Sequence, residues 1–304
     1  MRLRGLAILV ACTLAAGTAA AADPKSPSLP GARRCPIFPV TNVWNKRVDT
    51  LPVAADSQAL IDAIGADKSV HPDFGSYLGY GIPYNVVSTS KARPARISFQ
   101  YADESDRVAY PMPEHPNQEA SGDGHILIVD STTCKLYELF DAKGSGTSWK
   151  AGSGAVWNLR SNRLRPDGWT SADAAGLPIL PGLVRYDEVA AGAIRHALRF
   201  TAERTAKRHI FPARHDAGDA DATLPPMGLR VRLKASVDIS GYGKQARVIL
   251  RALKTYGMIL ADNGSPWFIS GASDRRYLDD DLHDLGKLKG TDFEVVDTSG
   301  LRNG

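Results

Sequence analysis

The sequence predicts a mainly β protein: an antiparallel β-sandwich or jelly-roll-like body with a few packed helices. Short segments rich in β-branched and aromatic residues recur along the chain, and clusters of glycine and proline separate them at irregular intervals. A helical pattern does not follow each segment, as it would in a fold of alternating strands and helices. The expected strands are residues 84–87, 95–101, 125–129, 135–140, 182–186, 196–201, 230–239, 258–261, 267–270 and 293–296.

Two segments predict the packed helices. Residues 53–64 have apolar side chains at helical spacing, and Asp56 or Ser57 is a candidate N-cap for them. Residues 244–256 repeat this spacing, and Gly257 follows at the position that a helix C-cap prefers. We therefore expect helices near both ends of the β-rich body.

The N-terminal residues predict export. Arg2 and Arg4 form a short basic region, and an apolar, alanine-rich stretch follows up to Ala22. We expect residues 1–22 to be a signal peptide, residues 23–40 a proline-rich extended N-terminal arm, and residues 41–304 a single β-rich domain. The protein would then be periplasmic or extracellular. A lipoprotein attached through Cys12 is the alternative, because L-V-A-C resembles a lipobox.

Two cysteines stay in the exported chain, Cys35 and Cys134. In an oxidising compartment their simplest arrangement is one disulfide between the N-terminal arm and the body. The formal net charge of +4 over 304 residues is too small for a general nucleic-acid or membrane-surface binder. We expect no nucleic-acid partner and no membrane span.

The segment from Trp157 to His215 predicts a polar cleft with aromatic walls. It combines Trp157 and Trp169 with several arginines, among them Arg165 and Arg185, and with turn-forming glycine and proline. A buried core does not need this mixture, whereas a site for a polar, ring-shaped ligand does. Tryptophan in a glycine- and proline-rich loop is typical of a platform on which a sugar ring stacks.

A predicted hairpin brings His125 near Glu138. If residues 131–134 form its loop, Leu127 pairs with Glu138, and His125 shares a sheet face with Glu138. A register slipped by one residue separates them. The pair is either an acid–base couple or an interior hydrogen-bonded pair.

Asp173 and His196 are further candidates, each with a structural alternative. Asp173 follows Ser171, so it could instead lie in the first turn of a helix. His196 lies on the more apolar face of a predicted strand, where a histidine is usually part of the core. His125, His196 and His215 lack the short spacing of zinc ligands, and we expect no metal.

The strand predicted at residues 230–239 alternates cleanly between apolar and polar positions. Its polar face carries Arg232 and Lys234. This face is either a solvated exterior or the floor of a groove for an anionic ligand.

Several segments together resemble a family of exported bacterial and fungal proteins. They are N-V-W-N at residues 42–45, H-P-D-F-G at residues 71–75, Y-A-D-E-S-D at residues 101–106, the run from G-W-T-S-A-D to V-R-Y-D-E-V at residues 168–189, L-R-A-L-K-T-Y-G-M-I at residues 250–259 and F-E-V-V-D at residues 293–297. The resemblance covers essentially the whole mature chain. It implies a single secreted domain and carries over no catalytic residues.

These observations predict a secreted carbohydrate-active protein that needs no cofactor and binds a polysaccharide or oligosaccharide. Glycoside hydrolysis needs two carboxyl groups on opposite sides of the glycosidic bond. We expect Glu138 and Asp173 in these roles, with His125 and His196 tuning their protonation. The substrate-binding residues would be Trp157, Trp169, Arg165, Arg185, Arg232 and Lys234.

Two other functions stay open. A polysaccharide lyase acting on an acidic glycan would use Arg232 or Lys234 to neutralise the uronate and His125 or His196 to take the proton. A non-catalytic glycan-binding or envelope protein would keep the groove without depending on the carboxylates. The sequence predicts no oligomeric state.

Overall fold

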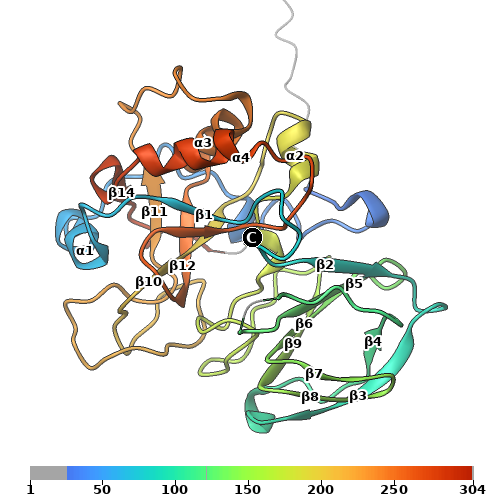
Figure 1. The fold of residues 1–304 in the computed structure, drawn as a ribbon. Coiled ribbons are helices and arrows are strands. Elements are labelled where there is room, and N and C mark those ends of the chain that lie inside the picture. The colour runs from blue at the N-terminus through green and yellow to red at the C-terminus, as the bar shows by residue number, and fades with distance from the viewer. Residues whose placement is uncertain (1–25, 121, 303–304) are drawn as a thin grey trace, which may run out of the picture.

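The computed structural model describes residues 26–120 and 122–302 (Figure 1). The predicted signal peptide and the lipobox-like segment lie outside these residues. The described chain forms fourteen strands in three sheets and four α-helices, so the mainly β prediction is confirmed. Figure 1 shows the two four-stranded sheets grouped on one side of the molecule and the six-stranded sheet, with helices α3 and α4, on the other.

The six-stranded sheet has the order β1-β13-β10-β12-β11-β14. Its strands are β1 (His71–Asp73), β10 (Leu198–Ala202), β11 (Arg230–Leu233), β12 (Met258–Asn263), β13 (Phe268–Ser270) and β14 (Phe293–Val295). Helix α3 (Lys244–Thr255) packs on β11 through its buried apolar face, and helix α1 (Ser57–Ile64) packs on β14. Both helices lie where the sequence predicted them. Two short helices, α2 (Tyr186–Ala190) and α4 (Asp279–His283), complete this half.

The two four-stranded sheets enclose a core of their own. One sheet contains β2 (Tyr84–Val87), β5 (Ile126–Asp130), β6 (Lys135–Phe140) and β9 (Ser153–Asn158). The other contains β4 (Tyr110–Met112), β3 (Arg93–Phe99), β8 (Ser148–Ala151) and β7 (Lys143–Ser145). Tyr110, Ile126, Leu139 and Trp149 are buried together in this second core.

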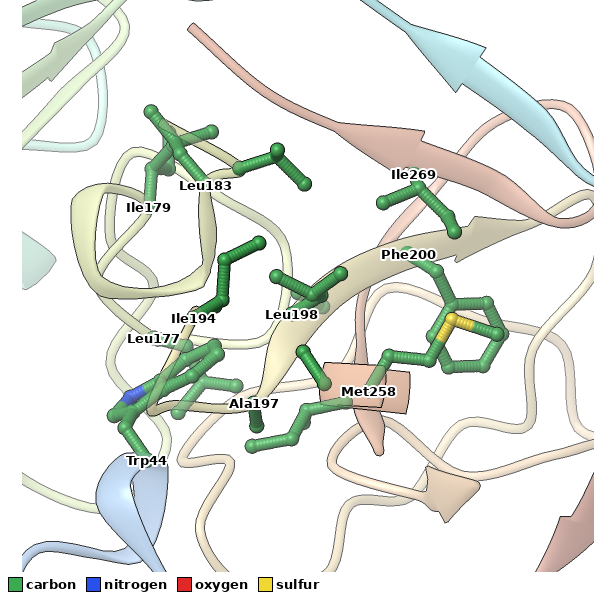
Figure 2. Close-up of a cluster of buried hydrophobic side chains, with 14 of the residues drawn as sticks. Trp44, Leu177, Ile179, Leu183, Ile194, Ala197, Leu198, Phe200, Met258 and Ile269 are labelled. Atoms are coloured by element: carbon green, nitrogen blue, oxygen red, sulfur yellow. The ribbon is translucent and has the colours of Figure 1, made fainter. Parts of the chain in front are cut away.

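Strand β5 connects the two cores because successive side chains of a strand point to opposite faces. Ile126 and Ile128 belong to the second core, whereas Leu127 and Val129 belong to the main core. All five residues of β5 are buried, so the strand is covered on both faces. Figure 2 shows part of the main core, in which Phe200 of β10 lies beside Met258 and Ile269, and Trp44 lies beside Leu177 and Ala197.

The sheets are mixed rather than purely antiparallel. The parallel pairs are β1 with β13, β10 with β12, β2 with β5 and β3 with β8. A parallel pair needs a long crossover connection, and strand β11 and helix α3 lie within the one between β10 and β12. Hydrophobic alternation predicts a strand but not the direction of the neighbouring strand, so the sequence pattern alone could not predict these parallel pairs.

Two predicted strands were wrong in extent or type. Residues 182–186 contain the end of a 3₁₀ turn (Leu180–Gly182), one isolated bridge from Val184 to Gly271 and the first residue of α2. Pro181 in this turn has no N–H to donate to a ladder. The strand predicted at residues 230–239 ends at Leu233, because the chain then turns with the Val237 N–H donating to the Lys234 carbonyl.

The predicted disulfide is confirmed between Cys35 and Cys134, with their Cα atoms 5.2 Å apart. It joins the segment predicted as an extended arm to the turn between β5 and β6. Leu29, Ile37 and Phe38 of that segment are buried in the main core, so the part of it that the structure describes is integrated with the body. None of the helices formed by residues 26–120 and 122–302 has the length and apolar character needed to cross a membrane.

Candidate functional site

A cavity of about 390 Å³, here called the central pocket, opens where the open end of the β5–β6 hairpin meets the end of β12. Loops from distant parts of the chain close it. It is lined by Tyr101, Glu104, Asp123, His125, Phe140, Ser153, residues 170–174, His215, Ala217, Asp262 and Asn263. The structure thus brings together His125 and Asp173 of the predicted site residues.

Asp173 organises the loop that forms one wall of the central pocket. Its Oδ1 accepts hydrogen bonds from the backbone N–H groups of Ala175 and Leu177, at 3.1 and 3.0 Å, and from the Ser171 hydroxyl at 3.2 Å. Its Oδ2 is buried and accepts no hydrogen bond. The loop is not helical, so the alternative role of Asp173 in the first turn of a helix is excluded. One carboxylate oxygen thus shapes the loop, and the other accepts no hydrogen bond at the wall of the central pocket.

Arg199 lies between two carboxylates. Its Nη2 is 3.7 Å from Asp173 Oδ2 and 3.4 Å from Asp262 Oδ2, while its Nη1 donates to the Ser270 hydroxyl at 2.8 Å. Because both Oδ2 atoms contact the same nitrogen, they can be no more than about 7 Å apart. A quarter of the Asp262 side chain is exposed, and that of Asp173 is covered.

A bulge in β12 places Asp262. Phe200 pairs with Leu260 but Thr201 pairs with Asp262, so Ala261 is the extra residue of β12. Such an insertion re-aims the side chains that follow it. Ala261 also accepts a hydrogen bond from the Ala175 N–H, which holds the Asp173 loop against β12. The bulge therefore brings the two carboxylates together.

Burial raises the pKa of both carboxyl groups. The pKa of Asp173 rises to about 8 because burial disfavours its charged form, although Arg199 opposes the shift. Burial also raises the pKa of Asp262, again opposed by Arg199. At neutral pH Asp173 is therefore mainly protonated. Since Oδ1 already accepts three hydrogen bonds, the proton belongs on Oδ2.

His125 supports the wall of the central pocket. Its Nε2 donates to the Ala172 carbonyl at 2.9 Å, and its Nδ1 lies 2.5 Å from Glu119 Oε2. Burial alone would lower its pKa, but the hydrogen bond and charge of Glu119 raise it above the usual value. Both ring nitrogens face acceptors, so the imidazolium form fits this place. His125 thereby fixes the backbone next to Asp173.

Glu104 and His215 also line the central pocket. His215 Nδ1 donates to the Ala174 carbonyl at 2.8 Å, which leaves Nε2 facing Glu104 Oε2 at 3.9 Å. Glu104 also accepts a hydrogen bond from the Thr170 N–H at 3.0 Å. Both side chains are partly exposed, so a ligand in the pocket can reach them.

Glu138 occupies a structural position. The predicted register is confirmed, since Leu127 pairs with Glu138 and Val129 with Leu136. The Glu138 side chain is fully buried, and its carboxylate accepts hydrogen bonds from the N–H groups of Ile179 and Leu180, each at 2.9 Å. Burial raises its pKa to about 7, and these N–H groups oppose the shift. Glu138 therefore holds the start of the 3₁₀ turn at Leu180, and its oxygens are not open to a substrate.

This position predicts a stability effect for Glu138. Glu138→Ala leaves two backbone N–H groups without a partner and creates a cavity, so we expect the free energy of unfolding to fall by about 3 kcal/mol. Glu138→Gln keeps one acceptor oxygen and should lose about 1 kcal/mol. Urea unfolding of both variants checks this. A folded Glu138→Gln protein that lost glycan cleavage several hundredfold would instead restore the predicted catalytic role.

Trp157, Trp169 and Arg165 form a stack beside the central pocket. The Arg165 guanidinium carbon lies 5.6 Å from the Trp157 ring centre and 5.5 Å from that of Trp169. Arg165 also pairs with Asp106 and donates to the Glu104 and Thr170 carbonyls. The two rings thus pack on a protein cation, and Trp157 is almost fully buried. Arg165 braces the loops that carry Glu104 and Thr170.

The other predicted site residues lie in two separate places. Arg185 and His196 are buried with Glu188, which is 2.8 Å from Arg185 Nη2 and 3.0 Å from His196 Nε2. Arg232 pairs with Glu294 at 2.7 Å, and Lys234 donates to the Thr291 carbonyl. None of the four lines the central pocket, because each is held by its own strand or helix neighbours.

Sequence reasoning missed Asp262 and Arg199. Residues 258–261 were predicted as a strand and Asn263 with Gly264 as a turn, so Asp262 was left between them without a role. An arginine between the apolar residues Leu198 and Phe200 was the available signal, because a charge inside a buried strand needs a partner. Among residues 26–120 and 122–302, no group of three or more histidine, cysteine or acidic side chains is arranged to hold a metal ion.

Comparison of the chain with protein-family models, with curated proteins and with solved structures found no match. The function is therefore argued from the central pocket itself.

Proposed function

We propose that the protein is a glycoside hydrolase that cleaves an extracellular or cell-wall polysaccharide in the central pocket. The observation that carries the proposal is the pair of carboxyl groups, Asp173 and Asp262, on either side of Arg199. Their separation of no more than about 7 Å is compatible with the spacing of carboxyl groups in glycosidases. Asp262 replaces Glu138 as the predicted partner of Asp173.

The two carboxyl groups have different environments, as an acid and a base require. Asp173 keeps its proton at neutral pH and is the general acid, which donates it to the glycosidic oxygen as the bond to the anomeric carbon breaks. Burial raises the pKa of Asp262 too, but a quarter of its side chain is exposed whereas that of Asp173 is covered, and we assign the ionised role to Asp262 on this difference. It is the carboxylate that attacks the anomeric carbon or activates the water that does so.

The rest of the central pocket suits a sugar. Tyr101 is half-exposed at its rim and offers an aromatic face, and Asn263 and Thr170 offer polar groups. The cavity of about 390 Å³ is within the range of small-molecule sites. The disulfide between Cys35 and Cys134 is consistent with an exported protein that acts in an oxidising compartment.

A panel of neutral, cationic and acidic polysaccharides tests this proposal. We expect new reducing ends to appear without the ultraviolet absorbance of an unsaturated uronate. Reducing ends together with that absorbance would indicate a lyase. Retention on an immobilised glycan without any cleavage would indicate a binding protein.

The pKa of Asp173 predicts the alkaline limb of the pH profile. The general acid must be protonated, so the rate is lost as the pH rises through about 8, falling about tenfold for each further pH unit. Initial rates of reducing-end release measure this, and thermal unfolding over the same pH range separates it from loss of the fold. A rate that stays constant well above this pKa would contradict the acid role of Asp173.

A further inference from the structure

We propose that the central pocket selects a cationic glycan, an amino-sugar polymer with free ammonium groups. This inference rests on the proposed hydrolase function and specifies its substrate class. The pocket is lined by four carboxyl groups, from Glu104, Asp123, Asp173 and Asp262, and none of its lining residues is a lysine or an arginine.

The nearest arginine, Arg199, already has carboxylate partners. Arg199 is almost fully buried and contacts Asp173, Asp262 and Ser270. It serves the carboxyl pair rather than a ligand. An acidic glycan entering this pocket would meet the exposed carboxylates of Glu104 and Asp123, while the two histidines of the lining, His125 and His215, already face Glu119 and Glu104. This arrangement disfavours such a partner.

The central pocket is also lined by more carboxyl groups than hydrolysis requires. Two carboxyl groups suffice to cleave a glycosidic bond. Glu104 and Asp123 are additional, and both are exposed enough to meet a ligand. An ammonium group bound by a carboxylate makes a stronger hydrogen bond than a neutral hydroxyl does. The two extra carboxylates therefore favour an amino sugar over its neutral counterpart.

A second observation points to a ligand here. Asp173 Oδ2 is buried at the pocket wall and has no hydrogen-bond partner. A buried polar atom of this kind normally has one. An acceptor oxygen of a bound sugar, such as the glycosidic oxygen, would satisfy the proton on Oδ2.

The pocket has the opposite sign to the chain as a whole, whose formal net charge is +4. Attraction of a polycation to the central pocket would come from its local carboxylates and not from the net charge of the protein. Binding should weaken as salt is added, because exposed charges are screened over about 8 Å at physiological ionic strength.

The test compares a glucosamine polymer that has free amino groups, the same polymer fully N-acetylated, and polygalacturonate. Cleavage is followed by reducing ends, and binding by retention on the immobilised polymers. We expect binding and cleavage of the glucosamine polymer in preference to the other two. Asp123→Asn and Glu104→Gln should each raise its KM about tenfold. Asp103→Asn is the matched control, because Asp103 lies beside Glu104 but is exposed and paired with Arg107.

The outcomes separate this inference from the proposed function. Equal cleavage of the acetylated polymer, unchanged in Asp123→Asn and Glu104→Gln, would overturn the cationic preference and leave the hydrolase. Salt-sensitive retention of the glucosamine polymer without cleavage, reduced in both variants, would support the preference and overturn the hydrolase. Preference for polygalacturonate would overturn the inference outright.

Discussion

Asp262→Asn should lower kcat for glycan cleavage by about 10³ while leaving the fold intact. The amide has nearly the same shape as the carboxyl group, but it can neither attack the anomeric carbon nor take a proton from water. Only a quarter of the Asp262 side chain is exposed, and its Oδ1 accepts a hydrogen bond from the Asn263 N–H, which the amide oxygen can also accept. Initial rates of reducing-end release on the best substrate of the panel measure the effect.

Asp219→Asn provides the control for Asp262→Asn. Asp219 pairs with Arg204 on the surface, and more than half of each side chain is exposed. We expect this variant to keep the rate of the wild-type protein, and circular dichroism should show that both variants are folded. An Asp262→Asn rate within twofold of wild type would remove Asp262 from the mechanism.

The sequence was sufficient where a feature depends on neighbours along the chain. The hairpin of β5 and β6 follows from period-two alternation and a four-residue loop, and its predicted register is the observed one. The disulfide follows from there being two cysteines in the predicted mature chain. Helix α3 follows from its apolar spacing and from Gly257.

The central pocket depends on contacts that the sequence does not show. Asp173 was a candidate from its loop, but its partner Asp262 lies about ninety residues later, after a bulge in β12, and the two meet only through Arg199 of the neighbouring strand β10. Glu138 was a plausible partner by residue type and sheet face. Only the backbone N–H groups of Ile179 and Leu180, from a segment predicted to lead into a strand, show what its carboxylate does.

For Trp169 and Arg165, too, the sequence shows the residue types but not which groups they contact. A tryptophan beside an arginine in a glycine-rich loop predicts a ligand platform, but the same residues can satisfy each other. Here the Arg165 guanidinium packs on the rings of both Trp157 and Trp169. Both tryptophans and Arg165 also line a separate cavity of about 540 Å³, so their use as a sugar platform stays a prediction.

Removing the disulfide should cause the largest loss of stability among these variants. Cys35 and Cys134 are separated by 99 positions, and a loop of this length restricts the unfolded chain enough to contribute about 4 to 5 kcal/mol. We expect the Cys35→Ala, Cys134→Ala double variant to lose about this much free energy of unfolding in urea, because both cysteines are buried and alanine introduces no polar group.

Reduction supplies the control for the disulfide variant. A reducing agent should lower the stability of the wild-type protein to nearly that of the double variant and leave the double variant unchanged, which separates the cross-link from the lost sulfur packing. The disulfide also ties the buried segment around Ile37 to the turn that follows β5. His125 of the central pocket directly precedes the same strand. Cleavage activity should therefore be lost at lower urea concentration in the double variant, in step with unfolding. Equal stability of the two proteins would show that the packing of Leu29, Ile37 and Phe38 alone holds this segment in place.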